Sequence, residues 1–83
     1  MANFNIRIEV KFKSGVLDPQ GETIKHALQN LDYPGIESVK TGKLFRVGLD
    51  AESAENALQT ARELADKLLA NTVIEDFEVE IEK

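Results

Sequence analysis

The sequence predicts an α+β fold in which a four-stranded antiparallel sheet carries two helices on one face. Three observations support this prediction. In three segments apolar residues alternate with polar ones, which is the period of a half-buried strand. In two others the apolar residues recur every three or four positions, as in an amphipathic helix. With one weaker strand added, the order along the chain is β-α-β-β-α-β, which packs as two layers.

The first strand and the first helix have the clearest patterns. The strand is expected over residues 4–12, "FNIRIEVKF", with one apolar face made of Phe4, Ile6, Ile8, Val10 and Phe12. The helix is expected over residues 22–31, "ETIKHALQNL", with an apolar stripe made of Ile24, Ala27, Leu28 and Leu31. The segment "DYPG" that follows combines proline and glycine, which end a helix.

The middle of the chain predicts two more strands. Residues 36–41, "IESVKT", form the weaker one, and Gly42–Lys43 is interpreted as a tight turn or bulge. Residues 44–50, "LFRVGLD", form the other, with Phe45, Val47 and Leu49 on one face.

The second helix and the last strand complete the order. The helix is expected over residues 53–70, with Ser53 as its N-cap and Asn71 just past its end in left-handed geometry. Its predicted buried stripe consists of Ala54, Leu58, Ala61, Ala65 and Leu68, widened by Leu64 and Leu69. The strand is expected over residues 76–82, with Phe77, Val79 and Ile81 facing inward.

Composition limits the classes of function. The 83 residues predict one domain, 1–83, and the absence of cysteine excludes disulfides and thiolate chemistry. A net charge of −5 disfavours nucleic acid and anionic membranes as partners. We see no secretory signal and no apolar run of about 20 residues, so we expect a cytoplasmic protein. The order of elements is that of a ferredoxin-like fold, although the strand order stays open.

Residues suited to catalysis are scarce. His26, the only histidine, lies opposite the apolar stripe of its helix and is expected to face solvent. The carboxylates lie on exposed faces, and no pair has the spacing of a general acid and base. The loop after the first strand lacks the arginine of an acylphosphatase-like site, and the predicted outer face of the sheet lacks the aromatics of an RNA-binding sheet. We therefore predict no catalytic, cofactor-binding or metal-binding residue. The charged outer face is either solvated or docked against another subunit.

The segment "SGVLDPQG", residues 14–21, leaves two alternatives open. Asp18-Pro19-Gln20-Gly21 suits a type I turn, and equally a helix start in which Asp18 is the N-cap and Pro19 the first helical residue. Val16 and Leu17 either pack into the core or are presented by a rigid loop to a partner.

Three motifs in this order resemble the PurS family, the small subunit of phosphoribosylformylglycinamidine synthase. They are "SGVLDPQG", "TGK" at residues 41–43 and "LLANTVIEDFEVEI" at residues 68–81. The resemblance implies a non-catalytic subunit that bridges a glutaminase subunit and a large synthetase subunit, and that assists ammonia transfer in purine biosynthesis. It implies a homodimer or tetramer. It also implies that this chain binds no cofactor, because ATP and magnesium belong to the synthetase subunit.

The resemblance suggests where docking takes place. As a hypothesis, the first and last motifs form fixed loops at the same edge of the sheet. The predicted interface residues are Val16, Leu17, Asp18, Pro19, Gln20, Gly21, Gly42, Lys43, Asn71, Val73, Ile74, Glu75 and Asp76. Two alternatives remain, namely a free-standing ferredoxin-like regulatory module that binds a small metabolite at a dimer interface, and a purely structural oligomer.

Overall fold

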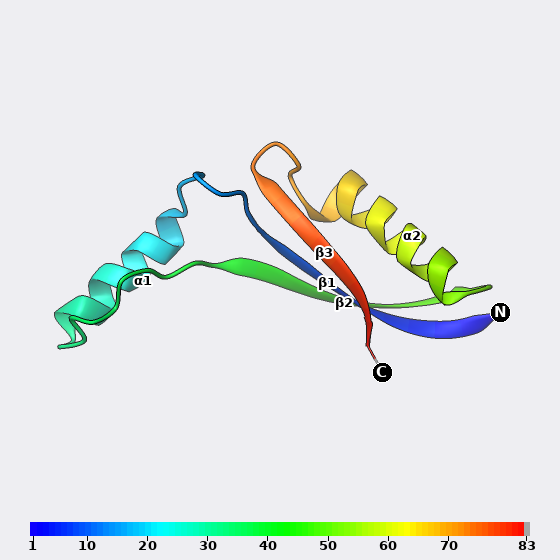
Figure 1. Ribbon diagram of the computed structural model, residues 1–83, viewed down its shortest axis with the longest axis horizontal. Coiled ribbons are helices and arrows are strands. Elements are labelled where there is room, and N and C mark those ends of the chain that lie inside the picture. The colour runs from blue at the N-terminus through cyan, green and yellow to red at the C-terminus, as the bar shows by residue number, and fades with distance from the viewer. Residues whose placement is uncertain (83) are drawn as a thin grey trace.

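The computed structural model describes residues 1–82 as a thin, elongated molecule measuring 53 × 27 × 14 Å. Three strands, two helices and one π-helical turn make up its regular structure (Figure 1). In chain order they are β1 (Ala2–Phe12), α1 (Pro19–Asn30), β2 (Gly42–Ala51), α2 (Ala54–Leu64), η1 (Ala65–Leu69) and β3 (Glu75–Glu82).

The sheet has three strands in the order β2-β1-β3, and both pairings are antiparallel. The central strand β1 aligns Ile6 with Val47 on one side and with Ile81 on the other. These three residues therefore share one face, as the alternation predicts. The α+β class is confirmed, but the prediction of a four-stranded sheet is wrong.

The missing strand is the weak segment at residues 36–41, which runs back along α1 instead of joining the sheet. Its polar groups bond to the start and the body of that helix. The Gln29 side-chain amide donates to the Ile36 carbonyl at 2.9 Å, and the Thr41 N–H donates to the Asp18 carboxylate at 2.6 Å. A backbone that has such partners gains little from a sheet ladder.

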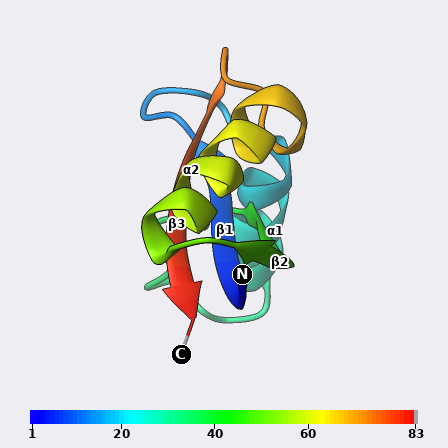
Figure 2. The same cartoon turned by 90° about the vertical axis from the view of Figure 1, so that its right-hand side faces the viewer.

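The core lies between the sheet and α2, which contacts all three strands. Ile6, Ile8 and Val10 of the central strand are fully buried. Figure 2 shows α2 lying across this face of the sheet. Because the buried residues of α2 and η1 are alanines, the helix backbone can approach the strands closely. The half-buried residues packed around this core include Phe4, Phe45, Phe77, Val47, Leu49, Val79, Ile81, Leu58 and Leu69.

The buried stripe of the second helix differs from its prediction. The buried positions are Ala57, Ala61 and Ala65, whereas Ala54 is exposed and Leu68 is 82% exposed. At the end of the helix the cause is the π-helical turn, in which Ala70 N–H bonds the Ala65 carbonyl five residues back. The extra residue in this turn rotates the last side chains, so that Leu69 rather than Leu68 packs against the core.

The first helix does not cover the sheet, so the prediction of two helices on one face is also wrong. Helix α1 projects beyond the end of the sheet, apart from α2 (Figure 1). Its apolar stripe is therefore uncovered: Ile24 is 37% and Leu31 66% exposed, and Leu28 is half-buried. The periodicity of α1 correctly predicts a helix, but the surface that its stripe faces lies outside this chain's own core.

Candidate functional site

Three segments meet at the end of the sheet from which α1 projects: residues 13–21, 40–43 and 71–76. We call this region the loop end. The Lys13 N–H donates to the Ile74 carbonyl at 2.9 Å, which joins the first segment to the third. The Lys43 ammonium lies 3.7 Å from the Glu75 carboxylate, which joins the second to the third. The loop end therefore brings together all three motifs that the sequence singles out.

Asp18 fixes the start of α1 to the chain that enters β2. One carboxylate oxygen accepts the Gly21 N–H at 2.9 Å and the other accepts the Thr41 N–H at 2.6 Å. The Thr41 hydroxyl donates to the same carboxylate at 2.9 Å. The side chain is the N-cap of the helix, with Pro19 in the first turn, so the helix-start alternative is correct.

The environment of Asp18 favours its charged form. The residue is only 4% exposed, but its carboxylate has three donors. The N–H groups of Thr41 and then Gly21 lower the pKa of Asp18, and the Thr41 hydroxyl and the nearby charge of Lys40 act in the same direction. These effects outweigh desolvation, so the carboxylate stays ionised as a structural clamp.

Two glycines allow the close backbone contacts beside this clamp. A Cβ at Gly21 would clash with the Val39 carbonyl and come within 2.9 Å of the Asp18 carboxylate. A Cβ at Gly42 would lie 2.7 Å from the Val10 carbonyl. Gly42 and Lys43 belong to β2 itself, so their interpretation as a tight turn or bulge is wrong.

The last motif closes on itself around a second buried carboxylate. Glu75 is 7% exposed, and its side chain accepts the Asn71 N–H at 2.7 Å. The Asn71 carbonyl accepts the N–H groups of Ile74 and Glu75, while its side-chain oxygen accepts that of Val73 at 3.2 Å. Asn71 does not have a positive φ, so its predicted left-handed geometry is wrong. The resulting turn is fixed by hydrogen bonds from both ends.

The apolar residues of the loop end differ in their exposure to solvent. Leu17 is 69% and Val73 82% exposed, while Ile74 is 37% exposed and Val16 is half-buried. Of the two alternatives for the first motif, presentation to solvent therefore holds for Leu17. Since the backbone on both sides is fixed by hydrogen bonds, these side chains sit on a preformed surface.

Sequence comparisons place the chain among known proteins. The family model PurS, described as phosphoribosylformylglycinamidine (FGAM) synthase, matches residues 5–83. The FGAM synthase subunit PurS of Methanocaldococcus jannaschii is 36% identical over 80 residues, covering 96% of each chain. The corresponding subunit of Bacillus subtilis is 38% identical over 81 residues, covering 96% of this chain and 94% of the relative. The chain belongs to the PurS family.

Solved structures agree with this assignment. The crystal structure of M. jannaschii PurS superposes with a TM-score of 0.86 at 36% identity, covering 96% of each chain. A PurS-like chain in the structure of PurLQS from Thermotoga maritima has a TM-score of 0.89 at 32% identity, covering 99% of this chain and 100% of that chain. The fold described above, including its projecting α1, is therefore shared across nearly the whole chain.

Some important residues of the loop end are not among the predicted interface residues. Thr41 is one of them, although it belongs to a motif and its N–H and hydroxyl both bind Asp18, 23 positions earlier. Lys13 and Lys40 line the space beside this clamp and belong to none of the predicted site residues. Contacts across such a separation depend on how α1 turns back, which no local pattern specifies.

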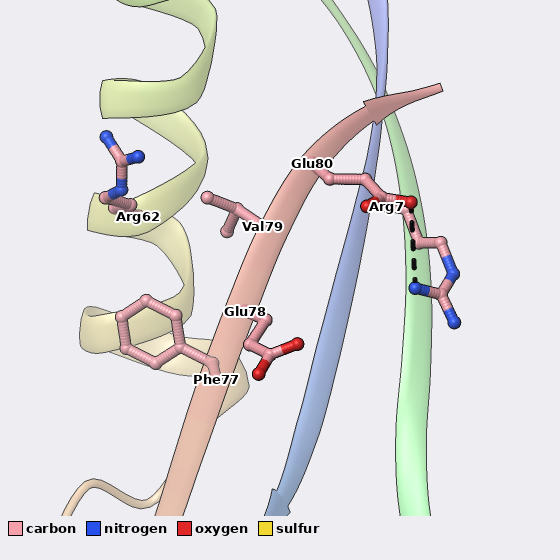
Figure 3. Close-up of a pocket in the computed structure, with 6 residues that line it drawn as sticks. All are labelled: Arg7, Arg62, Phe77, Glu78, Val79 and Glu80. Atoms are coloured by element: carbon pink, nitrogen blue, oxygen red, sulfur yellow. Dashed lines mark ion pairs between the residues drawn. The ribbon is translucent and has the colours of Figure 1, made fainter. Parts of the chain in front are cut away.

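The sheet face opposite α2 carries a set of paired charges. Figure 3 shows Glu78 and Glu80 on the Arg7 side of β3, while Phe77 and Val79 point toward α2 and its Arg62. Arg7 lies 3.9 Å from Glu80 and 3.1 Å from Glu9. Further pairs are Lys11–Glu78 at 3.5 Å and Arg46–Glu82 at 3.0 Å. Exposed pairs of this kind are worth about 0–1 kcal/mol each, which fits a solvated face.

Two features are absent from the part of the chain that the structure describes. Within residues 1–82 no three His, Cys, Asp or Glu side chains are grouped so that they could hold a metal ion. No helix in this range has the length and apolarity to cross a bilayer. His26 is exposed as predicted, and its imidazole lies 3.8 Å from the Glu22 carboxylate.

Proposed function

We propose that this chain is the small, non-catalytic subunit of phosphoribosylformylglycinamidine synthase in purine biosynthesis. In this role it bridges the glutaminase and the ATP-dependent synthetase subunits and assists the passage of ammonia from glutamine to formylglycinamide ribonucleotide. Membership of the PurS family over residues 5–83 supports the proposal. So does the likeness to the chain in the T. maritima PurLQS structure.

The observation that carries the proposal is the construction of the loop end. Its two buried carboxylates, Asp18 and Glu75, accept backbone N–H groups and fix the loops. Apolar side chains then project from this fixed backbone, chiefly Leu17 and Val73. A preformed apolar surface lowers the ordering cost of association, which is what a docking subunit requires.

We also propose that the chain works as a homodimer or tetramer. Helix α1 exposes an apolar stripe, and the core face of β2 is only half covered at Phe45, Val47 and Leu49. One chain thus has a helix whose apolar stripe is uncovered and a sheet face that has room for another helix. A two-fold arrangement in which each α1 packs on the other chain would cover both surfaces.

The proposal includes location and cofactors. The protein works in the cytoplasm, where purine biosynthesis uses it. The chain itself binds no cofactor, and the ATP and magnesium of the complex are held by the synthetase subunit. Equilibrium dialysis of the isolated chain with magnesium and ATP should show no saturable binding, and a dissociation constant in the micromolar range would contradict this part.

Reconstitution tests the function directly. The glutaminase and synthetase subunits from the same source are mixed with formylglycinamide ribonucleotide, ATP, magnesium and glutamine, and product is assayed with and without this chain. We expect glutamine-dependent synthesis only with the chain, whereas added ammonia supports the synthetase alone. If the chain makes no difference with glutamine, the proposal is wrong, and a screen for metabolite-induced shifts in melting temperature then tests the regulatory-module alternative.

Variants of the loop end test the docking surface. Leu17→Asp and Val73→Asp place a charge at strongly exposed positions, so they should leave folding intact and weaken co-purification with the two larger subunits. Ala54→Asp is the control, because Ala54 is exposed at the start of α2, at the end of the sheet away from the loop end (Figure 1). Unchanged association of both loop-end variants would contradict the proposed docking surface.

A further inference from the structure

A hollow of about 430 Å³ lies at the loop end, between the chain that leaves β1 and the chain that enters β2. We call it the lysine hollow. The residues that bear on its chemistry are Lys13, Ser14, Val16, Lys40, Thr41 and Asp76. All three PurS motifs contribute to its lining, whereas its three lysines, Lys11, Lys13 and Lys40, belong to none of them.

Two of these lysines, Lys13 and Lys40, lack the ion pairs that Lys11 and Lys43 make. Lys11 pairs with Glu78 at 3.5 Å and Lys43 with Glu75 at 3.7 Å. Among the carboxylates of residues 1–82, none lies within 4.0 Å of the ammonium group of Lys13 or Lys40. Lys13 is also half-buried, which makes an unpaired positive charge there more costly than one on an open surface.

Two acidic residues, Asp18 and Asp76, line the hollow, and only the first is already engaged. The Asp18 carboxylate accepts its three hydrogen bonds from Gly21 and Thr41, so its oxygens are turned to the backbone. The other, Asp76, lies opposite Lys11 in the register of β1 and β3 and has no ion pair within 4.0 Å among residues 1–82, so its charge offsets part of that of the lysines. The lysine hollow nevertheless presents two ammonium groups to an incoming anion, in a chain whose net charge is −5.

We propose that the lysine hollow binds an aspartate or glutamate side chain of a partner subunit, placed between Lys13 and Lys40. The proposal rests on the docking function above and specifies the chemistry of the docked segment. That segment carries an apolar side chain next to its carboxylate, because Leu17 is 69% exposed immediately after the Val16 wall of the hollow. An acidic residue beside an apolar one on a protein surface matches both features, whereas a free anion would use only the lysines.

The matching charges also set an expected salt dependence. Two ammonium groups facing one carboxylate attract it across several ångströms, and salt screens that attraction. Association of the wild-type chain with its partner should therefore weaken as salt rises, and most of this dependence should come from Lys13 and Lys40.

The test uses a double charge reversal, Lys13→Glu with Lys40→Glu, in the full chain. Its control is Arg62→Glu with Lys67→Glu, which changes the net charge equally at two exposed sites on α2 and η1, away from the hollow. Circular dichroism and thermal melting establish that both variants fold. Dissociation constants for each larger subunit are then measured by titration at low and physiological salt.

We expect the hollow variant to raise the dissociation constant for one subunit about tenfold or more at low salt and to lose most of the salt dependence. The control should stay within about threefold of wild type, because rim charges outside the contact act weakly. Restoring the charges as Lys13→Arg with Lys40→Arg should recover most of the affinity.

Other outcomes overturn the proposal in distinguishable ways. Equal losses in the hollow variant and the control would show a general charge effect. Wild-type affinity in the hollow variant, together with binding of inorganic phosphate at Ser14 and Lys40 observed by NMR, would assign the hollow to a small anion instead. Absence of any wild-type binding to the larger subunits would refute the docking function itself along with this inference.

Discussion

Replacing Gly21 with alanine tests whether the close contact between α1 and residues 36–41, which run back along it, holds α1 in place. Helix propensity alone favours alanine over glycine by at most about 1 kcal/mol. The structure predicts the opposite sign, because the new Cβ would clash with the Val39 carbonyl and crowd the Asp18 carboxylate at 2.9 Å. Forcing an extra carbon into a packed site costs about 1–3 kcal/mol, and a backbone carbonyl cannot swing aside as a side chain can, so we take the upper part of that range. Less the propensity gain, the expected net loss is about 1–2 kcal/mol.

Amide hydrogen exchange is the appropriate assay, because α1 can open without unfolding the sheet. A loss of 1–2 kcal/mol corresponds to roughly five- to thirtyfold faster exchange of the α1 amides after Gly21. Gly35→Ala is the control, since its Cβ would meet nothing within 4 Å and its φ is not in the left-handed region. Slower or unchanged exchange in Gly21→Ala would refute the contact, since propensity would then be the larger effect.

Three further predictions concern the core, the clamp and the second helix. Ile8→Ala should lower the free energy of unfolding in urea by about 2–5 kcal/mol, because Ile8 is fully buried. The pKa of Asp18 is lower in the folded than in the unfolded chain, so its stabilising effect is present above about pH 4 and lost as pH falls through the folded pKa. Protection of α1 amides should therefore fall below pH 4 in wild type, and Asp18→Asn should remove most of that fall. Leu68→Ser should change the free energy of unfolding in urea by about 0.5 kcal/mol or less, because Leu68 is 82% exposed.

The strands could be predicted because their signal is local. Alternation in β1, β2 and β3 specifies which side chains share a face, and the observed register places Ile6, Val47 and Ile81 together as expected. The aromatic residues also lie on the predicted inner face, where Phe45 and Phe77 pack against the core. Such a pattern needs no knowledge of what lies on either side of the strand.

The position of α1 could not be predicted from its pattern. A stripe such as Ile24, Leu28 and Leu31 indicates that a helix buries one face, but it does not identify the surface that covers it. The prediction assigns that stripe to the sheet of the same chain, and it takes the fourth strand from the weak pattern of residues 36–41. The structure instead leaves the stripe exposed in this chain, with residues 36–41 running beside the helix.

The sequence predicts that the first and last motifs lie together at one edge of the sheet, but it does not predict the hydrogen bonds within them. The three motifs do meet at the loop end, and four of their polar residues, Asp18, Thr41, Asn71 and Glu75, form hydrogen bonds that fix the loops. Asp18 and Glu75 are buried and accept N–H groups, a structural role that the motifs alone do not predict, and their place in an interface stays a prediction. The groups left for contact are side chains such as Leu17 and Val73, whose exposure only the folded backbone reveals.

The buried residues that fix the loops and the exposed residues available for contact should give two kinds of defect, which binding assays alone would not distinguish. Substitutions at Asp18 or Gly21 loosen the clamp, so they displace the whole surface and weaken docking through lost order. Substitutions at Leu17 or Lys13 leave the clamp intact, so they weaken docking at unchanged α1 protection. Measuring exchange and affinity on the same variants distinguishes the two, because loss of affinity without loss of protection can arise only from the contact surface itself.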